Sequence, residues 1–311
     1  MNSYRYVRAL FKYLTNINYH FLINAGLHLY DKMPDEEFIK RKFKATMEKE
    51  LDLQNPQTFN EKLQWIKLYD RKPEYTMMVD KYRVREYIKE LLGEEYLIPL
   101  LGVWDNPDDI DFDALPDQFV LKCNHNSGLG MCICKDKSKL DIKKVREELK
   151  KGLAQDYYLT GREWPYKNVL RKIICEQYME DQETQELRDY KFYCIHGEVK
   201  CVMINTDRQA DSATKADYYD KKYNWLNFTW GYEHADIPPE KPLNFEKMIE
   251  LAEILATDLL EARIDFYECN GKIYFGEITF FDGSGFDRID PIEWDYKLGS
   301  YLTLPSNIKA N

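Results

Sequence analysis

Near the end of the chain, two short β-like runs limit the possible folds more strongly than any other segment. Residues 262–268 and 272–280 alternate apolar with polar side chains on either side of Asn270 and Gly271. Two such runs around an Asn-Gly pair predict a β-hairpin. Because side chains alternate between the two faces of a strand, a slip of one residue in the pairing exchanges the faces. The register therefore decides which side chains can act together.

The register determines whether two carboxylates of this hairpin can cooperate. A two-residue turn would place Asp265 and Glu277 on opposite faces. A three-residue loop over 269–271, with Gly271 in the left-handed conformation, instead places Arg263 opposite Glu277 and leaves Asp265 on the same face. We favour the three-residue loop, because it gathers the charged side chains on one face and leaves an apolar face for a core.

The remaining pattern divides into a helical first third and a region of strand pairs. Thr58 and Glu61 form a capping-box signature at a helix start, and residues 80–92 are typical of an amphipathic helix closed by Gly93. The acidic, turn-rich segment 104–116 is expected to be a surface connection. Strand pairs that alternate with helices indicate an α+β fold with antiparallel hairpins. We expect strands at 119–123, 131–134, 172–179, 189–195 and 198–205, and helices at 139–153 and 245–260.

Composition narrows the classes of function. The chain has 311 residues with 44 basic and 54 acidic side chains, and its net charge of −10 disfavours non-specific binding to nucleic acid. A hydrophobic content of 44% is that of a globular protein rather than a disordered one. Seven cysteines, an odd number in a chain of this length, make a poor disulfide framework. They predict the reduced thiols of a cytoplasmic protein.

The first 30 residues raise the question of a membrane segment. Their most apolar stretch, Phe21–Tyr30, is too short to span a bilayer and is interrupted by Asn24. The simplest interpretation is a helix packed on the body of the protein. The basic residues Arg5, Arg8 and Lys12 keep a second interpretation open, a weak peripheral contact with the inner face of a membrane.

Three segments carry candidate chemistry. Arg263, Asp265 and Glu277 form either a solvated ladder of ion pairs or a site where carboxylates share Mg²⁺ with a triphosphate while the arginine neutralises phosphoryl charge. Lys122 leads into a loop of Asn, Ser and Gly at 124–130, which is either a plain hairpin loop or a cover for phosphates.

The third segment is the strand at 173–180, which begins apolar and turns acidic. It is either a core strand that runs out to solvent or the hinge of a nucleotide pocket, where main-chain groups read adenine and a carboxylate holds the ribose. Neither a Walker A loop nor a dinucleotide fingerprint accompanies it.

In this order, the three segments resemble the ATP-grasp superfamily, in which two α+β lobes grip ATP. Ala262-Arg-Ile-Asp-Phe266 and Phe275-Gly-Glu-Ile-Thr279 look like the corresponding strands of D-alanine–D-alanine ligases. The sequence is more similar to the TupA-like ATP-grasp proteins of bacterial cell-surface polysaccharide synthesis, from about residue 55 to Gly299. The motifs that carry this likeness are Asn60-Glu-Lys-Leu-Gln-Trp65, Asp80-Lys-Tyr-Arg-Val-Arg-Glu86, Val120-Leu-Lys-Cys-Asn-His125, Gly161-Arg-Glu-Trp-Pro165, Asp189-Tyr-Lys-Phe192 and Gly283-Ser-Gly-Phe286.

The resemblance implies an α+β ATP-grasp fold preceded by a mostly helical region. The implied divisions are a helical region at 1–75, a helix and acidic connection at 76–118, a small lobe at 119–179, and a large lobe with the metal site at 180–311.

The resemblance also implies a role for each candidate residue. The expected ATP-binding residues are Lys122, Asn124, His125, Asn126, Ser127, Gly128, Glu176, Gln177, Tyr178 and Glu180, with Asp181 as an alternative ribose contact. The expected metal ligands are Asp265 and Glu277, together with Thr279 where the family commonly has Asn. The expected catalytic residues are Arg263, Lys191 and Arg208. Gly283, Ser284 and Gly285 are expected on the acceptor side.

The implied function is an ATP- and Mg²⁺-dependent ligase that joins a carboxylate to an amine through an acyl phosphate. One substrate would be a sugar-acid or peptide-bearing precursor of a cell-surface polysaccharide, of the capsule, teichuronopeptide or lipopolysaccharide type. The other would be an amino acid or small amine. The exact substrates, the number of Mg²⁺ ions and the oligomeric state do not follow from the sequence.

Other functions fit parts of the sequence. Asp282 and Asp287-x-x-Asp290 suggest a glycosyltransferase of the same pathway, and Thr279 is compatible with a non-catalytic nucleotide-binding regulator. Cys123, His125, Cys132 and Cys134 suggest a zinc site, although Cys-x-Cys spacing is atypical of structural zinc.

Overall fold

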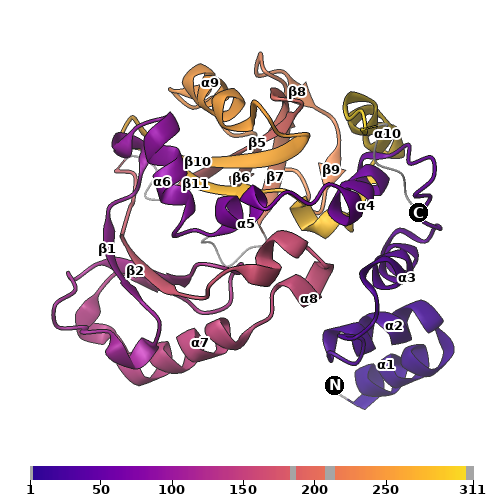
Figure 1. The fold of residues 1–311 in the computed structure, drawn as a ribbon, viewed down its shortest axis with the longest axis horizontal. Helices are drawn as coiled ribbons and strands as arrows, with labels where there is room; N and C mark the ends of the chain where they lie inside the picture. The colour runs from indigo at the N-terminus through magenta and orange to yellow at the C-terminus, as the bar shows by residue number, and fades with distance from the viewer. Residues whose placement is uncertain (1–2, 183–186, 207–213, 306–311) are drawn as a thin grey trace. The chain divides into compact units, whose positions relative to one another are not determined.

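The computed structural model describes residues 3–182, 187–206 and 214–305 (Figure 1). These residues form two compact units. The helical unit comprises Met1–Arg71, Tyr158–Trp164 and Phe281–Asn311, and the sheet unit comprises Lys72–Tyr157 and Pro165–Phe280. Because the chain passes between the units more than once, residues distant in sequence meet within each of them.

The helical unit is organised around α4 (Phe59–Tyr69), which packs against α3, α10 and the turn η5. Glu61 N donates to the Thr58 hydroxyl at 3.3 Å, and Thr58 N donates to the Glu61 carboxylate at 3.0 Å. The predicted capping box is therefore confirmed. The other elements of the unit are α1 (Ser3–Thr15), α2 (Ile17–Gly26), α3 (Asp35–Met47), α8 (Tyr158–Gly161), η5 (Asp282–Gly285), β12 (Ile289–Asp290) and α10 (Ile292–Tyr301).

The N-terminal segment forms two separate short helices rather than one. Asn16 lies between them, and its side chain caps the second helix by accepting a hydrogen bond from Tyr19 N at 2.9 Å. Within the described ranges, no helix combines the length and the apolar character that crossing a bilayer requires.

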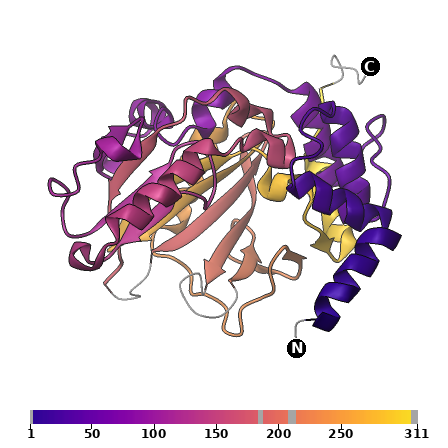
Figure 2. The same ribbon diagram turned by 90° about the horizontal axis from the view of Figure 1, so that it is seen from below.

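The sheet unit contains a four-stranded antiparallel sheet with the strand order β1-β4-β2-β3. Phe119 and Leu121 of β2 pack on Val145 and Leu149 of α7, which covers one face of this sheet (Figure 2). Because side chains alternate along a strand, Lys122 points to the opposite face. The elements are β1 (Leu100–Trp104), β2 (Phe119–Cys123), β3 (Met131–Cys134), α7 (Ile142–Ala154) and β4 (Ile173–Gln177).

A six-stranded antiparallel sheet with the order β11-β10-β5-β6-β7-β8 forms the rest of the unit. The helix α9 packs on one face, where Phe245 meets Phe192 with ring centroids 6.2 Å apart. Lys191, a neighbour of Phe192 in β5, therefore points away from α9. The elements are β5 (Arg188–Ile195), β6 (Glu198–Thr206), β7 (Lys215–Tyr219), β8 (Trp225–Leu226), α9 (Phe245–Ala256), β10 (Glu261–Cys269) and β11 (Lys272–Thr279). The short strand β9 (Thr229–Trp230) follows β8 and lies outside this sheet. Two short helices, α5 (Glu74–Val79) and α6 (Val84–Leu91), complete it.

The β10–β11 hairpin corrects the predicted register but confirms the shared face. Cys269 pairs with Lys272, so the turn has two residues, Asn270 and Gly271, with φ of 51° and 73°. The predicted three-residue loop is wrong. A bulge next to Asp265 shifts the register, so that Asp265 pairs directly with Glu277 and Arg263 with Thr279. One extra residue in β11 thus restores the same-face arrangement that the turn alone would prevent.

Two other segments differ from expectation. In the segment 104–116, Ile110, Phe112 and Leu115 are buried in the core beneath α7, whereas its acidic side chains lie at the surface. The helix predicted from residue 80 begins at Val84. Asp80 instead forms a turn, accepting hydrogen bonds from Tyr82 N and Arg83 N at 2.9 and 3.2 Å.

Candidate active site

A cavity of about 360 Å³ lies within the sheet unit, and charged side chains from both of its sheets line it. The four-stranded sheet contributes Lys122 and Glu176, and the six-stranded sheet contributes Lys191, Asp265 and Glu277. Apolar side chains such as Val120, Met131 and Ile133 line another part of the wall. The cavity thus combines an apolar region with a concentrated set of charges, as small-molecule sites commonly do.

At the four-stranded sheet, Glu176 lies between two cations. Its Oε2 is 2.6 Å from Lys122 Nζ, and its Oε1 is 3.4 Å from Arg85 Nη1. Arg85 Nη2 also donates to the carbonyl of Ile98 at 2.9 Å. One carboxylate facing two cations leaves a net positive charge at this part of the cavity, which favours an anionic ligand.

At the six-stranded sheet, Arg263 and Lys191 hold Asp265 from two sides. Arg263 donates from Nε and Nη2 to the two Asp265 oxygens, both at 2.7 Å, and Nη2 also donates to Glu277 Oε1 at 2.9 Å. Lys191 Nζ donates to Asp265 Oδ2 at 2.6 Å and to Asp189. Asp265 is only 2% exposed. This network is therefore buried, which excludes the solvated ladder of ion pairs as its description.

Lys81 connects this network to the loop that follows β2. Its Nζ lies 3.2 Å from Glu277 Oε2 and donates to the carbonyl of Asn126 at 2.9 Å. Burial alone would raise the pKa of Glu277, but Lys81, Arg263 and Lys191 outweigh it, and the pKa lies well below its usual value. Glu277 is therefore ionised at neutral pH and available as an anionic oxygen donor.

The loop after β2 divides into an anchored part and an exposed part. Asn124 is buried; it donates to Asp80 at 2.7 Å and accepts from Lys172 N at 2.7 Å. His125 Nε2 lies 3.1 Å from the Gln155 carbonyl, and burial lowers the pKa of this imidazole to about 4. Ser127 and Gly128 are exposed and line the cavity. The buried residues fix the base of the loop, while its tip faces the space that a ligand would occupy.

The end of β4 supplies the predicted hinge residues. Gln177 and Tyr178 line the cavity together with Glu176. Glu180 is not on the wall; it accepts hydrogen bonds from the Tyr178 hydroxyl at 2.7 Å and from Lys135 Nζ at 3.0 Å. Asp181 accepts from Asn270 N at 2.7 Å. Both acidic residues that follow the strand, Glu180 and Asp181, therefore form hydrogen bonds with other residues of the chain.

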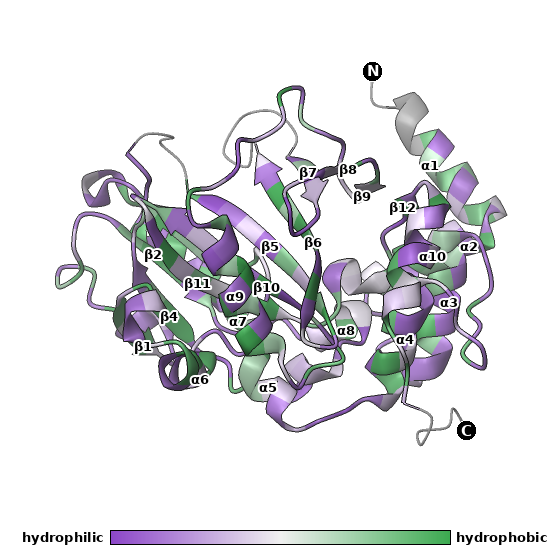
Figure 3. Cartoon of the chain, turned by 90° about the horizontal axis from the view of Figure 1, so that it is seen from above, coloured by the Kyte–Doolittle hydropathy of each residue, from purple (hydrophilic) through white to green (hydrophobic). Residues whose placement is uncertain are grey.

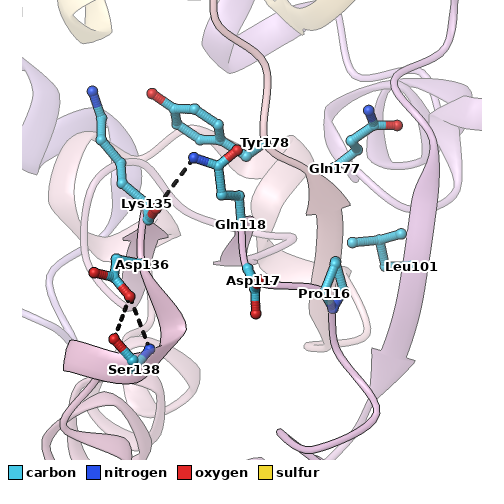
Figure 4. Close-up of a pocket in the computed structure, with 9 residues that line it drawn as sticks. All are labelled: Leu101, Pro116, Asp117, Gln118, Lys135, Asp136, Ser138, Gln177 and Tyr178. Atoms are coloured by element: carbon cyan, nitrogen blue, oxygen red, sulfur yellow. Dashed lines mark hydrogen bonds between the residues drawn. The ribbon is translucent and has the colours of Figure 1, made fainter.

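A second cavity, of about 870 Å³, opens beside the other side of Gln177 and Tyr178 (Figure 4). Its polar groups serve local turns. Asp136 Oδ1 accepts from Ser138 N at 3.0 Å and from Ser138 Oγ at 2.6 Å, and Gln118 Nε2 donates to the Lys135 carbonyl at 3.2 Å. Although it is larger, none of the buried ion pairs lines it, so we place the candidate site in the smaller cavity.

The predicted acceptor residues lie in the helical unit. Gly283, Ser284 and Gly285 adopt three successive left-handed conformations, with φ of 54°, 55° and 65°. Gln64 Nε2 donates to the Ser284 and Gly285 carbonyls at 3.0 and 2.7 Å, and Lys67 Nζ donates to the Ser284 carbonyl at 2.7 Å. Two buried side chains of α4 thus hold an unusual backbone conformation in place.

Several predicted residues take other positions. Thr279 Oγ1 donates to Glu277 Oε1 at 3.3 Å, and both Thr279 and Arg263 lie behind the cavity wall rather than on it. Arg208 lies outside the described residues. Within those residues, no three His, Cys, Asp or Glu side chains converge as a metal site, the four residues of the zinc alternative included.

Three charged residues were absent from the sequence prediction: Lys81 and Asp189, which line the cavity, and Arg85, which contacts Glu176. The apolar residues of the wall, such as Val120, Met131 and Ile133, were not predicted either. Lys81 and Arg85 belong to the motif Asp80-Lys-Tyr-Arg-Val-Arg-Glu86, which supported the family resemblance. Asp189 precedes Lys191 by two residues and therefore shares its face of β5. That spacing is the signal that could have identified it.

The defining pattern of the TupA-like ATPgrasp family matches residues 61–303. This match covers more than half of the chain, and the chain belongs to this family. The predicted family and the α+β ATP-grasp fold with a helical N-terminal region are confirmed.

Solved structures of ATP-grasp ligases resemble the chain at low identity. A D-alanine–D-alanine ligase from Bacillus anthracis, complexed with ATP, is 14% identical with a TM-score of 0.38 over 66% of this chain and 54% of that one. An L-amino acid ligase from Bacillus licheniformis is 12% identical with a TM-score of 0.43 over 76% of this chain and 51% of that one. The ATP-grasp ligase PsnB, complexed with a precursor variant, Mg and ADP, is 10% identical with a TM-score of 0.41 over 88% of this chain and 71% of that one.

The chain spans about half the length of the first two of these ligases. A comparison with curated proteins finds no match.

Proposed function

We propose that this chain is an ATP-dependent ligase that joins a carboxylate to an amine. One observation carries the proposal: Lys122, Glu176, Lys191, Asp265 and Glu277, from different strands, converge on one cavity. Membership of the ATP-grasp family supports it. Structures similar to the chain include ligases, one of them complexed with Mg and ADP.

In this proposal ATP lies along the cavity from its apolar part to its charged part. The adenine packs near Val120 and Ile133, with the main chain of Glu176–Tyr178 reading its edge. Lys122 contacts the phosphates, and the loop tip at Ser127 and Gly128 covers them. Glu180 or Asp181 holds the ribose. The net positive charge around Glu176 supports this direction of binding.

The oxygen donors at the other end suit a hard divalent cation. Asp265 and Glu277 are cross-strand partners, and carboxylate oxygens are the ligands that Mg²⁺ prefers. Asp265 and Glu277 would supply only part of the coordination, so phosphate oxygens and water would complete it, with Thr279 as a weaker candidate. Bound Mg²⁺ would supply a Lewis acid that offsets phosphate charge. Arg263 and Lys191 keep the Asp265 carboxylate in a fixed orientation.

The proposed reaction balances without a side-chain nucleophile. A carboxylate oxygen of the substrate attacks the γ-phosphorus of ATP, and the bond from that phosphorus to ADP breaks. The amine nitrogen then attacks the carbonyl carbon of the acyl phosphate, a C–N bond forms, and the C–O bond to phosphate breaks. The proton of the amine passes to solvent. The chain contributes positioned positive charge, from Lys81, Lys122 and Arg263 in particular.

For the substrates we propose a sugar-acid or peptide-bearing precursor of a cell-surface polysaccharide and an amino acid or small amine. The likeness to TupA-like proteins supports this choice of substrate class. The residues that line the cavity support the binding of the nucleotide and carry no information on these two substrates.

The test is a turnover assay with ATP, Mg²⁺ and a panel of uronic acids paired with amino acids. We expect release of ADP and phosphate that requires both substrates, and a product whose mass equals their sum less one water. Glu277→Gln should abolish turnover, whereas Glu198→Gln, which removes an exposed carboxylate on β6, should not. Consumption of a nucleotide sugar without ADP release would favour the glycosyltransferase. ATP binding without turnover over the whole panel would favour the regulator.

A further inference from the structure

The helix α1 (Ser3–Thr15) carries an apolar face that the protein does not bury. Val7, Leu10, Phe11 and Leu14 are 64%, 59%, 67% and 72% exposed. Successive residues of a helix turn by about 100°, so these four side chains fall within an arc of about 100°. Figure 3 shows the alternation of hydrophobic and hydrophilic residues along α1.

The helix α1 contacts α2 through side chains that lie outside the exposed apolar arc. The Tyr13 hydroxyl donates to Asn24 Oδ1 at 2.9 Å, and the Tyr13 ring lies 4.5 Å from the ring of His20. Lys12 Nζ lies 4.6 Å from the centre of the Tyr19 ring. At about 100° per residue, Lys12 lies opposite Leu10 and Leu14, whereas Tyr13 lies at the edge of the apolar arc, next to Leu10. The helix α1 therefore packs on α2, as the simplest interpretation expects, while its apolar arc stays exposed.

Charge distinguishes this segment from the rest of the chain. Residues 1–30 contain Arg5, Arg8 and Lys12 and no Asp or Glu, although the whole chain has a net charge of −10. Arg8 and Lys12 are exposed. The acidic residues in the first turn of α3 are paired with basic ones, Asp35 with Arg71, Glu36 with Lys40 and Glu37 with Arg41. An exposed apolar face beside basic side chains, in an otherwise acidic protein, is complementary to an anionic surface with an apolar interior.

We propose that α1 docks this protein on the surface of an anionic phospholipid membrane. Phe11, Leu10 and Leu14 insert their side chains at the boundary between headgroups and acyl chains, and Arg8, which flanks Phe11 on the helix, contacts lipid phosphates. Lys12 adds to the attraction between the helix and the anionic surface without inserting beside the apolar face. The helix lies in the plane of the membrane and does not cross it. This inference rests on the helical unit alone and does not depend on the proposed ligase activity.

The test is co-sedimentation of the full chain with vesicles, without nucleotide. We expect binding to vesicles of phosphatidylcholine and phosphatidylglycerol in equal parts, weaker binding at high salt, and little binding to phosphatidylcholine alone. Phe11→Glu should reduce partitioning by roughly tenfold or more, because it removes an apolar insertion and adds a negative charge. Arg8→Gln with Lys12→Gln should reduce it by roughly tenfold to thirtyfold, since each basic side chain near such a surface contributes about fivefold.

The matched control is Ile237→Glu, which adds the same charge at an apolar residue of the sheet unit that is 83% exposed. It should bind vesicles as the wild type does, and the circular dichroism of every variant should match the wild type. Equal binding by Phe11→Glu and wild type would overturn the proposal. A second result would also overturn it: wild type that does not bind anionic vesicles but forms a dimer, while Phe11→Glu is a monomer. In that case the apolar face of α1 binds a second copy of the chain.

Discussion

Two buried lysines, Lys191 in the sheet unit and Lys67 in the helical unit, have surroundings that shift the lysine pKa in opposite directions. Burial would lower the pKa of Lys191, but the Asp189 and Asp265 carboxylates outweigh it, and its pKa lies above the ordinary lysine value. Lys67 Nζ donates to neutral oxygens, those of Gln64, Gly161 and Ser284 at 2.8, 3.0 and 2.7 Å. Burial lowers the pKa of Lys67 to about 7, and attraction by Glu163 offsets only part of that shift.

The difference teaches that burial alone does not decide the charge of a lysine; direct contact with carboxylates does. In the sheet unit the carboxylates keep Lys191 charged, as the proposed binding of phosphates requires. In the helical unit Lys67 acts first as a hydrogen-bond donor that holds the backbone around Ser284. The rings of Phe281 and Phe286, 5.6 and 4.5 Å from Lys67 Nζ, complete its surroundings.

The largest effect is expected where the carboxylate contact is removed from the sheet unit. Asp265→Asn leaves Lys191 and Arg263 buried with one carboxylate fewer, so the free energy of unfolding should fall by about 3–5 kcal/mol. Urea denaturation measures this change. As a control, Glu198→Gln breaks an exposed pair with Lys200 and should cost less than about 1 kcal/mol. Equal stability of Asp265→Asn and wild type would show that Asp265 does not hold the two cations.

The second prediction uses pH to separate the two lysines. Above a folded-state pKa of about 7, Lys67 loses its proton in the folded state, while the unfolded chain keeps it up to the ordinary lysine pKa. The unfolded state binds more protons in this window, so wild-type stability should rise with pH relative to Lys67→Met, by at most about 1.4 kcal/mol per pH unit between pH 7 and pH 10.

Glu163 and Asp35 raise the pKa of Lys67 and Lys42 lowers it, so all three belong to its surroundings. Burial also raises the pKa of Glu163, and the attraction of Lys67 offsets part of that shift. The measurement is denaturation of wild type, Lys67→Met and Lys191→Met at several pH values. Because the pKa of Lys191 is raised, Lys191 keeps its proton in both states between pH 7 and pH 10. The free energy of unfolding of Lys191→Met should therefore change with pH as that of wild type does. If the free energy of unfolding of Lys67→Met also follows that of wild type over this pH range, the contrast between Lys67 and Lys191 is wrong.

A third change tests whether the charge of the sheet unit serves a ligand. Lys122→Met should weaken ATP binding by roughly tenfold to a hundredfold, the effect of losing one or two charge-assisted hydrogen bonds. Isothermal titration calorimetry with ATP measures it. Lys172→Met, which removes a lysine paired with the exposed Asp105, should bind ATP as the wild type does. Unchanged affinity in Lys122→Met would remove Lys122 from the proposed site.

The smallest effect is expected at the helix that carries Lys67. Thr58→Ala removes the cap of α4 and should lower the free energy of unfolding by about 1 kcal/mol. Thr58→Ser keeps a hydroxyl and should recover most of it. Thermal or urea denaturation distinguishes the variants, and a loss in Thr58→Ser equal to that in Thr58→Ala would mean that packing, not capping, matters at this position.

Local patterns predicted much of the fold. The capping box at Thr58 and the strands around Lys122 and Lys191 depend on neighbouring residues, so the sequence alone identified them. The hairpin register failed because a bulge beside Gly276 depends on tertiary packing: a Cβ at that position would lie 3.0 Å from the Asp265 carbonyl oxygen. Ile110 and Phe112 were assigned to the surface because the acidic residues around them obscured their apolar spacing.

The candidate site was only partly predictable. Asp265, Glu277 and Arg263 lie on one hairpin, so a sequence pattern could group them. Lys81 reaches Glu277 across almost two hundred positions of the chain, and no local spacing reveals such a contact. The burial of Lys67 likewise depends on segments distant in sequence, Gly161 and Ser284, whereas a lysine on a helix is ordinarily expected at the surface.

The central claim is that the charged cavity of the sheet unit binds ATP together with Mg²⁺ through Asp265 and Glu277. Isothermal titration calorimetry of ATP with and without Mg²⁺, on wild type and Glu277→Gln, tests it most directly. Wild type should bind ATP more tightly with Mg²⁺, and Glu277→Gln should lose roughly tenfold or more of that enhancement while still binding ATP without the metal. An undiminished Mg²⁺ enhancement in Glu277→Gln, or no binding of ATP to the wild-type chain, would contradict the account.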